Sequence, residues 1–105
     1  MPKYLYIYHA DTPMRPAPDE EAEAMAAWGR WMEKVGPKLI DPGQPVGLSK
    51  SVTATGVLDT VKNAAFGYSI VEADSIEEAC DLAKDNPMVL GGGSVEVAPI
   101  VEMPD

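Results

Sequence analysis

The chain has 105 residues, 46% of them hydrophobic and 24% charged, which is the size and balance of one globular domain and not of a disordered segment. Its 17 acidic and 8 basic residues give a formal net charge of -9, and no Lys/Arg cluster is present, so nucleic acids and anionic membrane surfaces are poor partners. Cys80 is the only cysteine, and no apolar stretch has the length of a membrane span. We therefore expect residues 1–105 to form a single cytoplasmic domain without an internal disulfide.

The first expected element is a strand over residues 3–10, which has the strongest β-forming composition and contains the only histidine, His9. Its residues alternate between two largely apolar faces, with Tyr4, Tyr6 and Tyr8 on one and Leu5, Ile7 and His9 on the other. Each apolar face needs a cover, which predicts helices on one side and a second subunit on the other. If Leu5 and Ile7 face the helices, His9 borders a helix-side cavity.

Residues 11–18 contain three prolines and are expected to form a loop that leads into a helix, which begins at Pro18 or Asp19 and runs to about Val35. The apolar stripe of this helix consists of Met25, Trp28, Met32 and Val35, spaced three and four residues apart. This spacing predicts that Trp28 is buried and that Trp31 is more exposed. Gly29 lies beside the stripe, where a missing side chain would let the helix approach the sheet closely.

The middle of the chain carries two further strand signals. Residues 39–47 are too rich in Pro and Gly for a regular element, and we expect a connection that packs on the sheet. Residues 49–55 are predicted to form the second strand, with a row of hydroxyl side chains on one face. Residues 56–63 supply turn chemistry, and residues 64–73 are predicted to form the third strand, in the centre of the sheet.

A short second helix is predicted by the capping-box spacing of Asp74-Ser75-Ile76-Glu77, and it should end before Asn86-Pro87. Its buried stripe is expected to consist of Ile76, Ala79, Cys80 and Ala83. Cys80 is thus interpreted as a small core residue, because its acidic neighbours do not favour a reactive thiolate.

The last strand is predicted over residues 94–101, after the triple glycine of residues 91–93. No Lys-Ser/Thr pair follows these glycines, which argues for a backbone bend and against a phosphate-binding loop. Pro99 cannot donate to a strand ladder, so this strand should lie at or near an edge. The element order predicts an α+β, ferredoxin-like βαββαβ domain with both helices on one face of an antiparallel sheet. The bare apolar face then predicts a homodimer, as a dimeric α/β barrel.

The chain also resembles the YCII-related domain proteins over nearly its whole length. The residues that carry the resemblance are Met25-Ala26-Ala27-Trp28-Gly29-Arg30-Trp31, Asp41-Pro42-Gly43-Gln44-Pro45-Val46-Gly47, Gly67-Tyr68-Ser69-Ile70, and Asn86-Pro87 through Gly91-Gly92-Gly93-Ser94-Val95-Glu96-Val97. The resemblance implies a dimeric α/β barrel of mostly uncharacterised function. Related members have been linked to acid–base lyase chemistry, such as dehydrochlorination of a chlorinated hydroxyquinone.

Two features of that family are missing. The Asp-Gly-Pro-Phe motif of one branch is absent, since this chain has Gly56-Val57-Leu58-Asp59. Family members proposed to be enzymes pair a histidine on the first helix with an aspartate just before a proline ahead of the last strand. Here Trp28-Gly29 and Asn86 stand in those regions, so the dyad does not carry over to this chain.

His9 and Asp41 are the candidates for a catalytic proton-transfer pair, because histidine titrates nearest neutrality and a carboxylate can orient it. The alternative for His9 is a partly buried histidine hydrogen-bonded to the backbone at a strand end. The alternative for Asp41 is an aspartate that caps the turn at Pro42-Gly43.

Tyr8, Trp28, Trp31 and Tyr68 are the candidates for an apolar pocket that binds an aromatic or other small apolar ligand, although core packing explains Trp28 equally well. No ligand spacing typical of a metal is present, and we expect no cofactor. Two functions follow. The preferred one is a non-catalytic dimeric module that binds a small molecule or a partner. The alternative is a small cofactorless enzyme of lyase or isomerase type, with His9 as the base.

Overall fold

The computed structural model describes residues 2–10 and 19–102. The expected loop at residues 11–18, and with it a helix start at Pro18, lies outside this part of the chain, whereas Asp19, the other expected start, lies two residues before the first helix begins. In chain order the elements are β1 (Lys3–His9), α1 (Glu21–Val35), the 3-10 turn η1 (Gly36–Lys38), β2 (Leu39–Asp41), β3 (Ser51–Thr53), β4 (Gly56–Leu58), β5 (Ala65–Glu72), α2 (Ile76–Ala83), α3 (Pro87–Leu90) and β6 (Ser94–Pro99).

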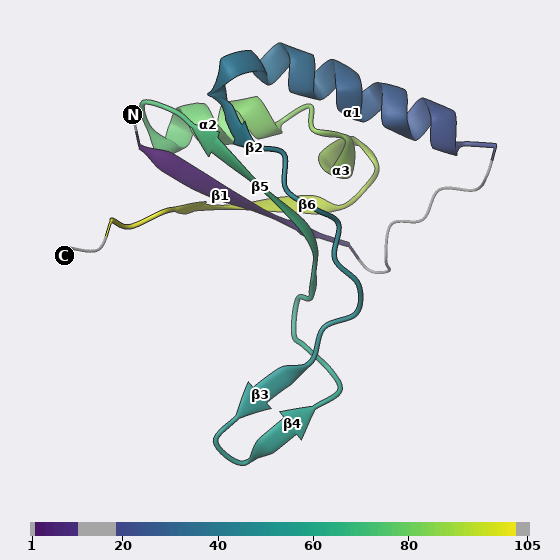
Figure 1. Ribbon diagram of the computed structural model, residues 1–105, viewed down its shortest axis with the longest axis vertical. Coiled ribbons are helices and arrows are strands. Elements are labelled where there is room, and N and C mark those ends of the chain that lie inside the picture. The colour runs from purple at the N-terminus through teal and green to yellow at the C-terminus, as the bar shows by residue number, and fades with distance from the viewer. Residues whose placement is uncertain (1, 11–18, 103–105) are drawn as a thin grey trace.

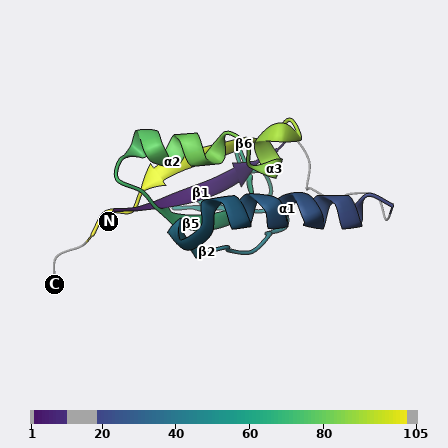
Figure 2. The ribbon, with the colours of Figure 1, turned by 90° about the horizontal axis from the view of Figure 1, so that it is seen from above.

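One antiparallel sheet with the strand order β2-β5-β1-β6 forms the body of the molecule. Helices α1 and α2 lie on the same side of this sheet (Figures 1 and 2), which is the expected ferredoxin-like arrangement. Strand β6 is an edge strand, as Pro99 predicts, and Pro99 pairs with Tyr4 of the central strand β1. None of the helices in the described residues is long and apolar enough to cross a membrane.

The tyrosine side of β1 faces the helices, which reverses the expectation for Leu5 and Ile7. Tyr6 is fully buried, and its hydroxyl donates to the backbone carbonyl of Ala79 in α2. The helices can cover these large rings because α2 presents small buried residues, Ala79 and Ala83, to the sheet. Leu5 and Ile7 therefore lie on the side without helices, where they are only half-buried.

Helix α1 is rotated relative to the predicted stripe. Trp31 is 3% exposed and Met25 is 75% exposed, whereas Trp28 is only partly buried, so the predicted order of the two tryptophans is wrong. The observed orientation lets the Trp31 indole Nε1 donate to the carbonyl of Leu82 at 2.9 Å, which satisfies its buried N–H. A side chain at Gly29 would meet nothing within 4 Å, so this glycine does not mediate a close approach to the sheet.

The second strand of the sheet is β2, which the composition of residues 39–47 had assigned to a connection. Leu39 pairs with Val71 of β5, and a further bridge joins Pro45 to Gly67. The chain passes so close to β5 at Gly43 (φ 76°) that a Cβ there would lie 1.6 Å from the Tyr68 carbonyl oxygen. Only glycine fits this combination of positive φ and backbone contact.

Residues 51–53, predicted as part of the second strand of the main sheet, instead pair with β4 in a separate hairpin. We call residues 48–58 the β3–β4 arm. Figure 1 shows that the arm extends from the sheet on the side opposite the helices. Sequence pattern did not separate the arm from the sheet because a hairpin strand and a sheet strand share the same alternation.

The second half of the chain contains one element that was not predicted, the single-turn helix α3. The Asn86 side chain caps it by accepting from the Met88 backbone N–H at 2.8 Å, and Pro87 occupies its first position. Cys80 is exposed rather than part of the core, because α2 turns Ala79 and Ala83 toward the sheet. The last strand ends at Pro99, two residues earlier than expected.

Candidate functional site

His9 lies at the end of β1 with both ring nitrogens in contact with oxygen acceptors. Nδ1 lies 2.9 Å from the carbonyl oxygen of Ala64, and Nε2 lies 2.9 Å from Oε1 of Glu96. Burial lowers the pKa of His9, but the bonds to Ala64 and Glu96 outweigh burial, so the pKa is raised overall. The contacts thus favour the doubly protonated imidazolium, in which both nitrogens donate.

The side of the sheet on which His9 lies follows from the strand register. Ile7 pairs with Glu96, and His9 pairs with Ser94 two positions along β6, so all four side chains lie on the side without helices. A small polar cavity of about 150 Å³ borders His9 there, lined by His9, Ala10, Asn63, Gly92, Gly93 and Ser94. This cavity contains no aromatic residue of α1, which corrects the expected helix-side cavity.

Asp41 lies far from His9 along the sheet. Asp41 pairs with Ile70 of β5, whereas His9 pairs with Ala65, and five positions along a strand correspond to about 17 Å. The Asp41 carboxylate accepts a hydrogen bond from the Gly43 backbone N–H at 2.8 Å. This is the turn-capping arrangement, so the structure does not bring the expected His9–Asp41 pair together.

A chain of buried hydrogen bonds centres on Tyr8, beneath the helices. Asn86 Nδ2 donates to the Tyr8 hydroxyl at 3.4 Å, Tyr8 donates to Ser69 Oγ at 2.7 Å, and Ser69 donates to the carbonyl of Pro42 at 2.7 Å. Burial raises the pKa of Tyr8, and the contacts with Ser69 and Asn86 offset this only in part. Each hydroxyl in the chain both donates and accepts, so the network joins β1, β5 and the start of α3 as a structural unit.

Three of the four predicted pocket aromatics form one cluster. The Trp28 ring meets the Tyr8 ring edge-on at a centroid distance of 5.4 Å, and Trp31 lies 5.9 Å from Trp28. Tyr68 pairs with Ile7 and is on the opposite face of the sheet, so it does not belong to this cluster. Trp28 and Asn86, which stand in the regions of the family dyad, both contact Tyr8.

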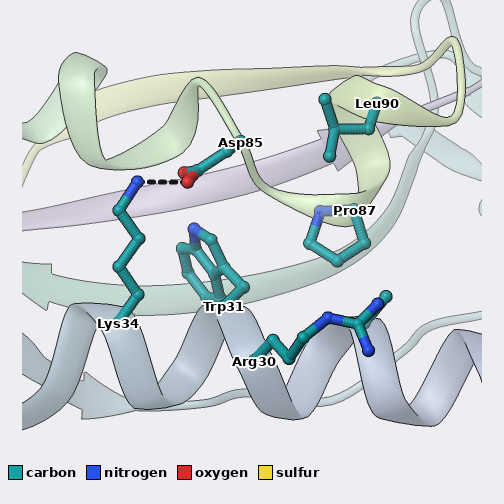
Figure 3. Close-up of a pocket in the computed structure, with 7 residues that line it drawn as sticks. Arg30, Trp31, Lys34, Asp85, Pro87 and Leu90 are labelled. Atoms are coloured by element: carbon teal, nitrogen blue, oxygen red, sulfur yellow. Dashed lines mark hydrogen bonds and ion pairs between the residues drawn. The ribbon is translucent and has the colours of Figure 1, made fainter.

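The larger cavity, which we call the α1–α3 groove, lies between these two helices and has a volume of about 250 Å³. Figure 3 shows Trp31 between α1 and the segment that leads into α3, with Pro87 and Leu90 above Arg30. The lining residues are Ala27, Arg30, Trp31, Lys34, Asp85, Pro87 and Leu90. Trp31 supplies a buried floor, and the exposed side chain of Leu90 forms an apolar wall.

Two cations and one carboxylate line the groove. Lys34 pairs with Asp85, as Figure 3 shows. Arg30 pairs with Glu23 at 3.2 Å, but both side chains are mostly exposed, and an exposed pair of this kind contributes little and exchanges readily. Arg30 is therefore the cation best able to turn toward an anion bound in the groove.

Sequence reasoning did not find this groove, although it named Trp31. The groove depends on the rotation of α1 and on the position of α3, and neither is encoded in a local pattern. The Asn86-Pro87 pair is the one local signal, since Asn followed by Pro is a good helix start. Within the described residues, no group of three or more His, Cys, Asp or Glu side chains is placed to hold a metal ion.

The sheet order and helix placement define an α+β domain of ferredoxin-like fold. A similar solved structure is 5-chloro-2-hydroxyhydroquinone dehydrochlorinase (TftG) from Burkholderia phenoliruptrix AC1100, determined in complex with 2,5-dihydroxybenzoquinone. The two chains share 24% sequence identity, 91% of each is covered, and the TM-score is 0.50. This similarity establishes the shared fold. No protein-family model and no curated protein sequence matches the chain.

Proposed function

We propose that the protein is a dimeric module that binds a small, planar, acidic ring compound in the α1–α3 groove. The observation that carries the proposal is the combination of the Trp31 floor, the Pro87 and Leu90 walls and the Arg30 guanidinium around one cavity. Ligand sites typically combine an apolar lining with a few polar groups that fix orientation. The YCII-related resemblance of the sequence is consistent with such a role.

The size of the groove argues for a ligand with a single ring. Its volume of about 250 Å³ is just below the ~300–1,000 Å³ that is usual for ligand pockets, and this excludes a dinucleotide-sized cofactor. Arg30 favours a ligand with acidic oxygens, because a guanidinium binds them through paired hydrogen bonds. The similar solved structure was determined with 2,5-dihydroxybenzoquinone, a compound of this size and chemistry.

The homodimer is the second part of the proposal. Leu5, Ile7, Tyr68 and Ile70 share the side of the sheet without helices, and each is only half-buried in the single chain. A face-to-face contact between two sheets would remove this apolar surface from water. The cytoplasmic location remains a prediction from composition.

The alternative, an acid–base enzyme with His9 as base, has less support. A base needs a nitrogen with a free lone pair, whereas both His9 nitrogens face acceptors and the pKa is raised. The dehydrochlorinase activity belongs to the similar protein and, at 24% identity, carries over only as a hypothesis. Turnover of 5-chloro-2-hydroxyhydroquinone that is lost in His9→Gln would reverse this preference.

The binding proposal is tested by titrating the 15N-labelled protein with 2,5-dihydroxybenzoquinone and following the indole N–H signals by NMR. The chain has two tryptophans, so Trp31 reports on the groove and Trp28 serves as an internal reference. We expect a saturable shift of the Trp31 signal and a smaller shift of Trp28.

Arg30→Gln should weaken the affinity by roughly 10- to 100-fold, the range expected for loss of a charge-assisted hydrogen bond. Lys50→Gln is the matched control, because it removes one positive charge from an exposed ion pair outside the groove. An unmoved Trp31 signal, or equal weakening by the two variants, would contradict binding in the groove.

A further inference from the structure

The β3–β4 arm presents an apolar surface to solvent. Its exposed apolar residues, with their exposed fractions, are Leu48 (82%), Val52 (80%), Val57 (60%) and Leu58 (55%). Val52 and Val57 are directly paired across the hairpin, so they form one continuous patch on one of its faces. An isolated two-stranded hairpin is marginally stable in water, and a surface that packs against it would stabilise it.

The side of the sheet without helices, which we call the open face, is also the side on which the arm extends. Figure 1 shows α1 and α2 on one side of the sheet and the arm on the other, so the arm stands beside the face that the helices leave bare. A body packed against Leu5, Ile7 and Ile70 would therefore lie next to the arm.

The charges at this surface permit a second copy as the occupant of this space, because on the open face Glu96 pairs with His9 and Glu72 lies opposite Lys3. The chain has a net charge of -9, so two copies repel each other except where their contacting surfaces lack acidic groups. Residues 51–58 of the arm contain no charged residue. At the base of the arm Lys50 pairs with Asp59 at 2.8 Å, which leaves that end locally neutral as well.

The area of the open face alone falls short of a stable interface. Strands of 7, 8, 6 and 3 residues cover roughly 20 × 20 Å, or about 400 Å² per copy. Two such faces bury about 800 Å², below the ~1,200–2,000 Å² of stable interfaces. Burying Leu48, Val52 and Val57 of the arm adds roughly 60–120 Å² each, or about 360–720 Å² for two copies, which brings the total to about 1,200–1,500 Å² and into the lower part of that range.

We infer that the β3–β4 arm is a dimerisation arm that packs against a second copy of this chain, through the Val52–Val57 patch and Leu48. This inference rests on the homodimer of the proposed function and extends it. The arm supplies the part of the interface that the sheet face cannot provide.

The test is sedimentation equilibrium of the full chain and of the Val52→Asp/Val57→Asp double variant. Both residues are exposed, so the variant should keep the far-ultraviolet circular dichroism of the wild type. We expect its dimer dissociation constant to rise by at least about tenfold. Ala22→Asp, at an exposed position in the first turn of α1, adds negative charge away from the arm and should leave the constant within about twofold.

The outcomes distinguish failure of the dimerisation arm from failure of the proposed homodimer. A wild-type dimer that the arm variant weakens no more than Ala22→Asp does would overturn the dimerisation arm and leave the sheet-face dimer standing. A wild type that stays monomeric at every concentration would overturn both.

Discussion

The two faces of strand β1 differ in how completely a single chain covers them. On the helix side, Tyr6 is fully buried and hydrogen-bonded to α2, and Tyr8 takes part in a closed network with Ser69 and Asn86. On the open side, Ile7 is only half-buried, and the His9–Glu96 pair lies at the end of the strand. Alternate residues of β1 thus belong either to a core that the single chain covers completely or to a surface that it leaves partly exposed.

This difference predicts that substitutions on the two sides affect different properties of the protein, the stability of the single chain on one side and binding surfaces on the other. Substitutions on the helix side remove packing that every copy of the chain needs in order to fold. Substitutions on the open side and the arm change surfaces that matter only when something else is present. Stability of the single chain should therefore respond strongly on the first side and weakly on the second.

The largest expected effect is at Trp31. Trp31→Ala removes a buried indole and its hydrogen bond to Leu82, and should lower the free energy of unfolding by about 3–5 kcal/mol. Trp28→Ala should cost distinctly less, because Trp28 is only partly buried. Denaturant unfolding followed by circular dichroism measures both, and equal losses would contradict the observed rotation of α1.

Removing the hydroxyl group of Tyr8 or of Tyr68 makes the same chemical change on the two faces of the sheet. Tyr8→Phe takes the acceptor from the buried Asn86 Nδ2 and the donor from Ser69 Oγ, which keeps only its bond to Pro42, and should cost about 1–3 kcal/mol. Tyr68→Phe, on the open face, should change stability by no more than about 0.5 kcal/mol. Similar losses in the two variants would show that the faces are energetically alike.

The sequence predicted three of the four strands of the sheet, β1, β5 and β6, but neither β2 nor the faces that the helices turn toward the sheet. Alternation identified the tyrosine side of β1, yet both sides are apolar, and periodicity alone does not say which one meets the helices. The orientation was set by the small side chains of Ala79 and Ala83 and by the partner of the Trp31 N–H, which lie far apart in the chain. For the same reason the sequence grouped Tyr8, Trp28 and Trp31 with Tyr68, which lies on the other face, and did not predict the groove beside Trp31.

The pH dependence of stability tests the His9 contacts on the open side. Because the pKa of His9 is raised in the folded state, its contribution is fully present below the unfolded value of about 6.5 and is lost as pH rises through the folded pKa. The free energy of unfolding should therefore decrease from about pH 6.5 upward, and Glu96→Gln should flatten this decrease. An identical slope in wild type and variant would show that Glu96 does not raise the pKa of His9.

The smallest effect has the opposite sign. Gly29 lies in the middle of α1 with nothing near its missing Cβ, so Gly29→Ala should raise stability by about 0.4–1 kcal/mol. Thermal unfolding measures this gain. A loss of stability would mean that the helix lies closer to the sheet at Gly29 than the structure shows.

The central claim is that the open face of the sheet is completed by a second copy of the chain, and sedimentation equilibrium of the wild type tests it most directly. The single chain has a mass of 11.2 kDa, and we predict twice that mass at micromolar concentration, with a return to the single-chain mass on dilution. Ile7→Lys, which places a charge on the open face, should give the single-chain mass at the same concentration while it remains folded. A wild type that sediments at 11.2 kDa up to its solubility limit would contradict the account.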